Sequence, residues 1–264
     1  MRKAIKNGVV IPESEAVIPV TDRGLQYSYS VYEYLRIKNG VFVHLDEHIA
    51  RLRESLDGIG LRIQYSVEDI VESLKLLCRE EGLTDETFRI LIVGGGDGYY
   101  FITHFPHHAC PAEYYDIGIK CTTFHGERYL PTMKTGNLLM QFLALKDAES
   151  KGCYEGLLVN SKGYVTEGTR SNFYGIKDGV IYTASDDEVL HGVTRLGLVD
   201  SANKLGLPIK YEPIYAADFQ KYDSLFITST SMKALPIDEI DGVKVPRKAQ
   251  DLVLKLSDLI GEWE

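Results

Sequence analysis

The chain has 264 residues, of which 44% are hydrophobic and 25% charged, and its formal net charge is −9 with a sequence pI near 5.3. These values are typical of a globular protein long enough for two cores, and they exclude a disordered or low-complexity chain. The acidic balance offers no general attraction for nucleic acid or anionic lipid, so an anionic ligand must be held by local groups.

The sequence also argues against a membrane protein and a metal site. No stretch approaches the roughly 18 apolar residues that cross a bilayer. The four cysteines are scattered without a CxxC pair, and the seven histidines show no zinc-ligand spacing. We therefore expect reduced thiols, a cytoplasmic location and no bound metal.

In the first half, β-branched and aromatic runs alternate with helical periodicity. An Asn39-Gly40 turn predicts a hairpin, Asp46 is expected to cap a helix, and a Gly94–Gly98 run ends a short buried strand. The predicted strands span residues 9–20, 27–36, 41–43 and 88–93, and the helices begin at Asp46 and at Val67, the second ending at Gly82.

The stretch from His104 to Tyr114 has two prolines and little periodicity, which favours an interdomain connection. In the second half, the helix over residues 137–151 is expected to bury Leu138, Phe142 and Leu145. The other predicted helices span residues 194–205 and 249–260, and the strands span 117–124, 155–160, 164–167, 172–176, 180–183, 209–214 and 224–228. The pattern predicts an α+β fold with an N-terminal domain over 1–110, a C-terminal domain over 118–264 and a connection over 108–118.

Two single residues stand where cofactor chemistry could occur. Lys134 lies between a proline-initiated extended segment and an apolar helix; a buried lysine is activated to attack a carbonyl, although a solvated loop lysine has the same local pattern. Glu167 ends a strand before Gly168, where a carboxylate could keep the ring nitrogen of a bound cofactor protonated. The alternative for Glu167 is an exposed strand-end carboxylate.

Three further features could bind a phosphate. The helix that begins at Thr194 offers backbone amides and a hydroxyl, the strand end at Thr230 and Ser231 offers hydroxyls, and Arg51 lies beside the apolar face of its helix. Each feature has a simpler explanation: a hydrated helix end, a hydroxyl-rich turn and a structural salt bridge. The Gly94–Gly98 run fits neither a P-loop nor the dinucleotide fingerprint, so it is interpreted as a bend.

In this order, these residues resemble the class IV aminotransferases, the fold-type IV pyridoxal phosphate enzymes. The similarity runs from Asp22-Arg23-Gly24 to Asp241-Gly242 and is strongest over residues 152–155, 165–172, 175–179 and 226–230. The resemblance implies the two-domain fold-type IV architecture, with a smaller N-terminal α/β domain and a larger C-terminal mixed-sheet domain. It also implies a homodimer that binds pyridoxal 5'-phosphate and acts on a small amino acid and a 2-keto acid.

The resemblance also assigns roles to residues. Lys134 becomes the Schiff-base lysine, which also moves the substrate proton, and Glu167 becomes the partner of the pyridine nitrogen. The phosphate is assigned to Arg51, Val193, Thr194, Thr230 and Ser231, and the substrate to Tyr27, Tyr32, Tyr34, His104, Met232 and Lys233.

The substrate positions depart from familiar patterns of the family. The segment Tyr99–His104 has no arginine to hold a substrate carboxylate, so His104 is considered a partial substitute. Tyr34 replaces a small glycine of branched-chain enzymes, and Lys233 replaces a frequent glutamate. The sequence predicts a transaminase of the D-amino acid or branched-chain type. An aminodeoxychorismate lyase and a non-catalytic pyridoxal phosphate-binding protein are the alternatives.

Overall fold

The computed structural model describes residues 2–263, which divide into two compact units. The first unit comprises the chain up to His108 together with Met133–Asn137, and the second comprises Ala109–Thr132 and the chain from Leu138 onward. Each unit combines helices with a sheet, which confirms the predicted α+β class. The predicted boundaries assign all of 118–264 to one domain, whereas the segment that carries Lys134 groups with the first unit.

The first unit is an antiparallel six-stranded sheet with the order β2-β1-β6-β5-β3-β4. Its strands are β1 (Lys3–Lys6), β2 (Val9–Pro12), β3 (Ser30–Lys38), β4 (Val41–Phe42), β5 (Glu86–Val93) and β6 (Tyr99–Pro106). Its helices are η1 (Glu13–Glu15), α1 (Arg23–Gln26), α2 (Leu45–Gly58) and α3 (Val67–Glu81).

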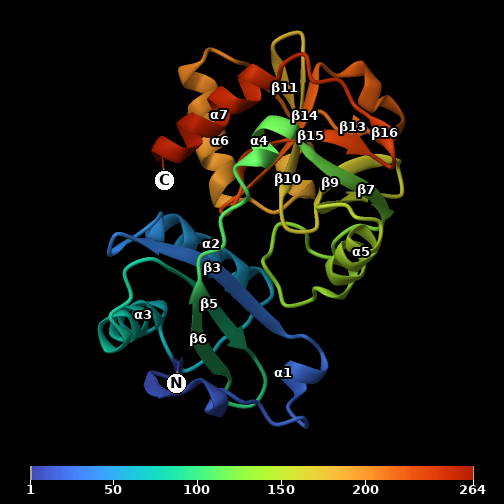
Figure 1. Ribbon diagram of the computed structural model, residues 1–264. Helices are drawn as coiled ribbons and strands as arrows, with labels where there is room; N and C mark the ends of the chain where they lie inside the picture. Colours follow the sequence, from blue (N-terminus) through green and yellow to red (C-terminus); the bar gives the residue numbers. More distant parts are fainter. Residues whose placement is uncertain (1, 264) are drawn as a thin grey trace. The chain divides into compact units, whose positions relative to one another are not determined.

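Helices α2 and α3 cover one face of this sheet, called the helix face (Figure 1). Alternate residues of β5 and β6, including Phe88, Ile90 and Ile102, are buried there against Leu52 of α2 and Leu74 of α3. Because side chains alternate along a strand, the residues between them point to the opposite face. That face carries Tyr32 and Tyr34 and is called the tyrosine face.

The glycine run after β5 allows two backbone segments to approach closely. A Cβ on Gly24 would overlap the carbonyl oxygen of Gly94, and Gly95 adopts φ +99°, where a Cβ would lie 2.9 Å from the Gly24 amide nitrogen. The Asp22 carboxylate caps α1 in the same turn by accepting from the amide of Gly24 at 2.8 Å. The run is therefore a bend, as the sequence predicts, and it anchors the start of α1.

The second unit contains the larger set of strands, which combines parallel and antiparallel pairs. These are β7 (Ile119–His125), β8 (Glu155–Val159), β9 (Tyr164–Gly168), β10 (Asn172–Lys177), β11 (Val180–Tyr182), β12 (Ile209–Lys210), β13 (Ile214–Tyr215), β14 (Ser224–Ser229), β15 (Lys233–Ile240) and β16 (Val243–Lys244). Its helices are α4 (Glu113–Ile117), α5 (Leu139–Ser150), η2 (Asp186–Glu188), α6 (Val193–Lys204), η3 (Ala216–Lys221) and α7 (Gln250–Trp263).

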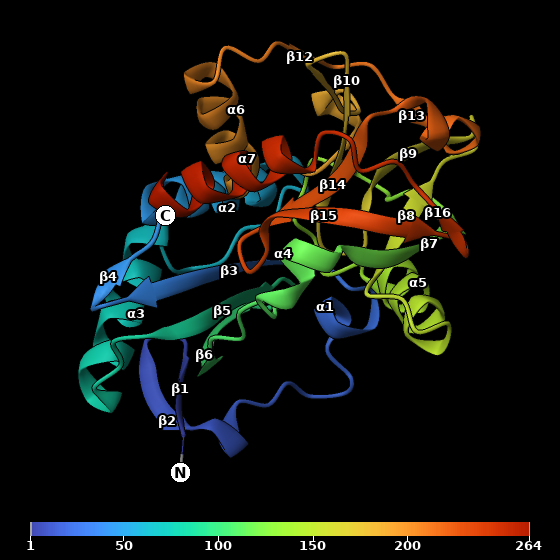
Figure 2. The same cartoon turned by 45° about the horizontal axis from the view of Figure 1, so that its top comes forward.

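Six of these strands form a closed ring. The order β10-β14-β15-β7-β8-β9 is completed by a pairing of β9 with β10, in which Glu167 lies opposite Asn172. The pairs β15–β7 and β7–β8 are parallel and the others in the ring are antiparallel. Helices α6 and α7 lie side by side next to β14 and β15 (Figure 2). The ring places Glu167 at the junction where it closes.

Several local predictions are wrong. Strand β6 occupies Tyr99–Pro106, so the expected connection from His104 begins too early, and β1 and β15 lie outside every predicted strand. The N-cap of α2 is His44, at φ 50° and without a side-chain cap, rather than Asp46.

Helix α5 is also oriented differently from the prediction. Its buried residues are Gln141, Ala144 and Ala148, while Phe142 is 63% exposed. The physical reason is close packing: a Cβ on Gly156 of β8 would lie only 3.0 Å from the Ala144 carbonyl oxygen, so the helix approaches the strand most closely where its own side chain is the small one of Ala144. Within residues 2–263, no helix is long and apolar enough to cross a membrane.

Candidate active site

The segment that carries Lys134 is attached to β3 in the first unit. Thr135 forms a β-bridge with Val31, the Tyr32 amide donates to the Lys134 carbonyl oxygen at 3.0 Å, and the Lys134 amide donates to Ser55 Oγ of α2 at 3.0 Å. Gly136 is required here, because a Cβ would overlap Ser30 Oγ. The backbone of Lys134 is therefore held by hydrogen bonds on both sides.

The amine of Lys134 lies over an aromatic ring. Its Nζ is 4.7 Å from the centroid of the Tyr32 ring, and the residue is only partly exposed. A ring face attracts the protonated amine, while partial desolvation disfavours the charge. The structure thus holds Lys134 in a defined position on the tyrosine face.

Arg51 of α2 forms a buried ion pair with Glu33 of β3. Arg51 Nε and Nη2 donate to the two Glu33 oxygens at 2.7 Å each, and His48 Nδ1 lies 3.0 Å from Oε2. Burial alone would raise the pKa of Glu33, but the charge and hydrogen bonds of Arg51, with His48 and Lys134, lower it to about 2. Burial also lowers the pKa of His48, so its ring is neutral at pH 7. The salt bridge is what the structure shows for Arg51, and its contact with phosphate stays a prediction.

Arg89, which is not among the site residues predicted from the sequence, also belongs to the tyrosine face. In the antiparallel register Arg89 of β5 lies opposite Tyr34 of β3, and its guanidinium carbon is 5.8 Å from the Tyr32 ring and 5.9 Å from the Tyr34 ring. Arg89 Nε is buried and has no hydrogen-bond partner among the described residues. The signal was present in the sequence, because Phe88 and Ile90 face the core and Arg89 between them must face the other way.

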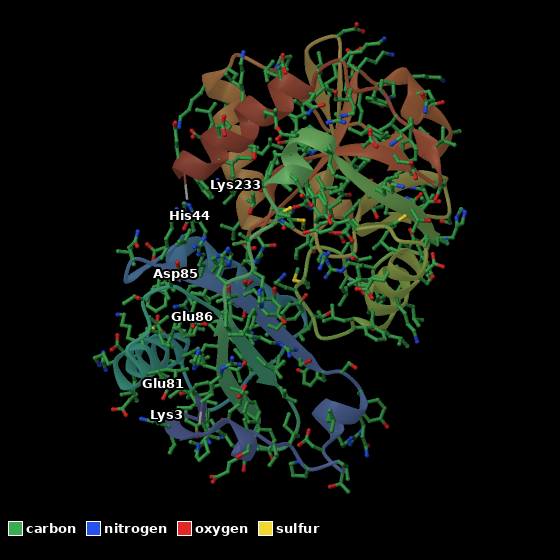
Figure 3. All side chains as sticks on the ribbon, viewed as in Figure 1. Lys3, His44, Glu81, Asp85, Glu86 and Lys233 are labelled. Carbon is green, nitrogen blue, oxygen red and sulfur yellow. The ribbon has the colours of Figure 1, made fainter. Side chains whose placement is uncertain are left out.

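The structure does not bring His104 to this group. His104 lies opposite Phe88 on the helix face, 5% exposed, with its ring nitrogens 3.8 Å from carboxylate oxygens of Glu81 and Glu86, both labelled in Figure 3. Since Tyr32 and Tyr34 point to the opposite face, a role for His104 in holding substrate beside them has no support in the geometry. Tyr27, also assigned to substrate, is 71% exposed and stacks with Arg23.

In the second unit, Glu167 is held from two directions. It is buried at the end of β9, where Arg128 Nη1 donates to Oε1 at 3.2 Å and the Leu190 amide donates to Oε2 at 3.2 Å. Arg128 is buried as well and was not singled out in the sequence. The exposed-carboxylate interpretation of Glu167 is wrong. An oriented carboxylate of this kind can accept a hydrogen bond from a protonated ring nitrogen.

The start of α6 has the properties of an anion site. Its N-cap is Gly192 without a side-chain cap, and no acidic residue lies in its first turn, where Val193 and Thr194 are buried. Free amides at such a terminus attract phosphate. Asn172 Nδ2 donates to the Leu190 carbonyl at 2.9 Å, and a Cβ on Gly192 would overlap Asn172 Oδ1. Asn172 therefore links the segment that contacts Glu167 with the helix terminus.

Four predicted site residues, Thr230 to Lys233, lie at the turn before β15 and at the start of that strand, and their side chains have different surroundings. Thr230 is partly buried and Ser231 is exposed, so both hydroxyls are placed at the turn. Met232, in contrast, is 1% exposed in the apolar core, and Lys233 extends along α7, where its Nζ would collide with a Cβ on Gly261 (Figure 3). The geometry favours a packing role for Met232 and a helix-end contact for Lys233.

Comparisons with known proteins find relatives along most of the chain. The model of the family described as amino-transferase class IV matches residues 30–240. A D-alanine aminotransferase of Listeria monocytogenes is 31% identical, with 92% of this chain and 89% of the relative covered. A probable branched-chain-amino-acid aminotransferase of Rickettsia conorii is 29% identical, with 89% and 86% covered.

Solved structures show the same similarity. The T.th. branched-chain amino acid aminotransferase with pyridoxamine 5'-phosphate has a TM-score of 0.91 and 25% identity, covering 99% of this chain and 93% of its own. A hypothetical aminotransferase of Mycobacterium tuberculosis in its PLP-bound form has a TM-score of 0.84 at 19% identity, covering 99% and 98%, which supports the fold alone. The resemblance seen in the sequence is thus confirmed, and the chain belongs to the class IV aminotransferase family of enzymes.

Proposed function

We propose that this enzyme uses pyridoxal 5'-phosphate, bound through Lys134, to move an amino group between a small amino acid of the D-alanine or branched-chain type and a 2-keto acid. The observation that carries the proposal is the fixed position of the Lys134 amine over Tyr32, on the face that also carries Arg89. When bound, the cofactor supplies an electron sink for the charge that develops at the substrate α-carbon.

The residues of the second unit fit this cofactor. Glu167 is oriented by Arg128 and Leu190 to accept from the pyridine nitrogen, and the uncapped amides of Val193 and Thr194 suit the phosphate dianion. Hydroxyls of Thr230 and Ser231 are further candidate donors to the phosphate. Lys134 would also carry the proton away from the substrate α-carbon, because its amine is released when substrate binds.

The substrate carboxylate is assigned to Arg89. A guanidinium with a buried, unpartnered Nε gains a charge-assisted hydrogen bond when a carboxylate enters. Tyr34 packs edge-on against Phe105 with ring centroids 6.0 Å apart, which adds an aromatic wall beside Arg89. These bulky rings favour a small substrate side chain over a long one.

An amino-donor panel tests the proposal. Purified protein with pyridoxal phosphate is mixed separately with D-alanine, L-leucine and aminodeoxychorismate, and the visible absorption and the products are followed. The proposal expects the absorption band to disappear with one equivalent of keto acid formed, for wild type but not for Lys134→Ala. Pyruvate with an aromatic amine from aminodeoxychorismate would instead identify a lyase. No change with any amine would leave a binding protein.

We also propose that the protein is a cytoplasmic homodimer. Helix α5 exposes Leu139, Phe142 and Leu143 on one side, and this apolar stripe supports the homodimer that the family resemblance implies. Light scattering of the purified holoenzyme gives the oligomeric state directly. All four cysteines are unpaired, which is consistent with the proposed cytoplasmic location.

A further inference from the structure

Glu155, the first residue of β8, is a fully buried carboxylate that no step of the proposed reaction uses. Its Oε1 accepts from the amides of Gly156 at 3.0 Å and Thr169 at 3.1 Å and from Thr169 Oγ1, and its Oε2 accepts from Ser171 Oγ at 3.0 Å. Arg170 Nε lies 3.7 Å from Oε2. Apart from its neighbour Gly156, every one of these groups belongs to the turn that follows Glu167.

The four donors around Glu155 match its ionised form. Burial raises the pKa of the Glu155 carboxyl above its usual value, and Arg170, Thr169, Ser171 and the Gly156 amide oppose that effect only in part. Four donors directed at two oxygens are satisfied by a carboxylate, whereas a protonated acid would turn one acceptor into a donor. A buried charge is costly unless it is matched in this way, so the turn and the carboxylate depend on each other.

The turn in question determines where Glu167 ends. The Gly168 amide donates to the Ser171 carbonyl at 2.8 Å, which closes the turn between β9 and β10. Glycine is needed at position 168, because a Cβ there would overlap Ser171 Oγ and would lie 3.2 Å from the carboxyl carbon of Glu155. The one β9–β10 pair, Glu167 with Asn172, borders this turn directly.

We infer that Glu155 is a positioning residue for Glu167: by binding the 168–171 turn, it sets the direction in which the Glu167 carboxylate faces the cofactor's ring nitrogen. The inference rests on the proposed function. Arg128 and Leu190 hold the carboxylate oxygens of Glu167, while Glu155 holds the backbone from which that side chain extends. The hydrogen bonds that Glu155 accepts come from Gly156 and from this turn, so its effect on Glu167 is proposed to pass through the turn.

The test compares Glu155→Gln with Thr122→Val in the holoenzyme. The glutamine keeps the size of the side chain but replaces one acceptor by a donor, so a donor of the turn loses its acceptor. Thr122 is an equally buried polar residue of the same unit that bonds Asp241 rather than the turn, so its variant measures general destabilisation. Three quantities are recorded: the thermal midpoint without cofactor, the dissociation constant for pyridoxal phosphate, and the pH titration of the visible band.

Both variants are expected to lower the thermal midpoint. Only Glu155→Gln should shift the titration of the band, and it should weaken cofactor binding about tenfold, the loss expected for a misaligned hydrogen bond to a charged group. If Glu155→Gln unfolds, Ser171→Ala, which removes a single donor from the same carboxylate, should give a smaller shift in the same direction.

The inference would be overturned if a folded Glu155→Gln protein had the same titration and the same dissociation constant as wild type. The same result in Ser171→Ala, where that variant replaces Glu155→Gln, would also overturn it. Glu155 would then be a structural residue. Failure of the proposed function looks different, because wild type itself would then show no visible band or Lys134→Ala would keep it. That result would remove both claims together.

Discussion

Replacing Glu33 by glutamine should destabilise the protein more than any single exposed-charge substitution. The carboxylate is fully buried and receives two hydrogen bonds from Arg51, whose side chain is 7% exposed. The change keeps the shape but removes the negative charge that faces the buried guanidinium. Breaking a buried pair from one side costs about 3–5 kcal/mol.

The pKa of Glu33 gives an independent magnitude. It is lowered from 4.5 to about 2, which corresponds to about 3 kcal/mol of stability at neutral pH, at about 1.4 kcal/mol per pH unit. A carboxyl whose pKa is lowered in the folded state stabilises the protein at pH values above its unfolded-state pKa. This contribution is lost as the pH falls through the folded-state pKa. Between pH 5 and pH 3 the loss should be about 2 kcal/mol.

Urea unfolding of wild type and Glu33→Gln at pH 7, 5 and 3 measures both effects. Glu80→Gln is the matched control, because Glu80 pairs with Lys3 on the surface at 3.0 Å and should contribute less than about 1 kcal/mol. The gap between wild type and Glu33→Gln should narrow by about 2 kcal/mol on going from pH 5 to pH 3. A gap at pH 7 no larger than that of the control, or one that stays constant with pH, would refute the reasoning.

Three further substitutions have distinct expected outcomes. Gly24→Ala should cost more than about 2 kcal/mol in urea unfolding, because its Cβ would overlap the Gly94 carbonyl. Gly40→Ala, where a Cβ meets no atom but φ is +79°, measures backbone strain alone, about 1–2 kcal/mol, and a loss for Gly24→Ala no larger than this would contradict the argument. Arg89→Met should raise KM for the amino donor at least about tenfold with a smaller change in kcat, and an unchanged KM would remove Arg89 from substrate binding. Phe142→Ser should change the unfolding free energy of the monomer by less than about 0.5 kcal/mol but weaken self-association in light scattering; a large loss of monomer stability would show that Phe142 is not at a surface.

Much of the fold could be predicted because local patterns agree with it. Helix α3 has a continuous apolar stripe, a Ser66 capping box and Gly82 at its end, so its bounds follow from sequence alone. Where the local signal is weak, prediction failed. Helix α5 has apolar side chains on several sides, and only its close approach to Gly156 determines that Ala144 is inside and Phe142 outside.

The sequence by itself determined the family, through the order of Lys134, Glu167 and the Thr194 helix. It also determined, for the strands that it predicted, which side chains alternate between the two faces. Only the tertiary structure decided which side chains share a surface. It pairs Arg51 with Glu33, sends His104 to the helix face and adds Arg89 to Tyr32 and Tyr34. The physical reason is that strand register joins residues that are distant along the chain, and burial and hydrogen bonding depend on that register rather than on neighbours in the sequence.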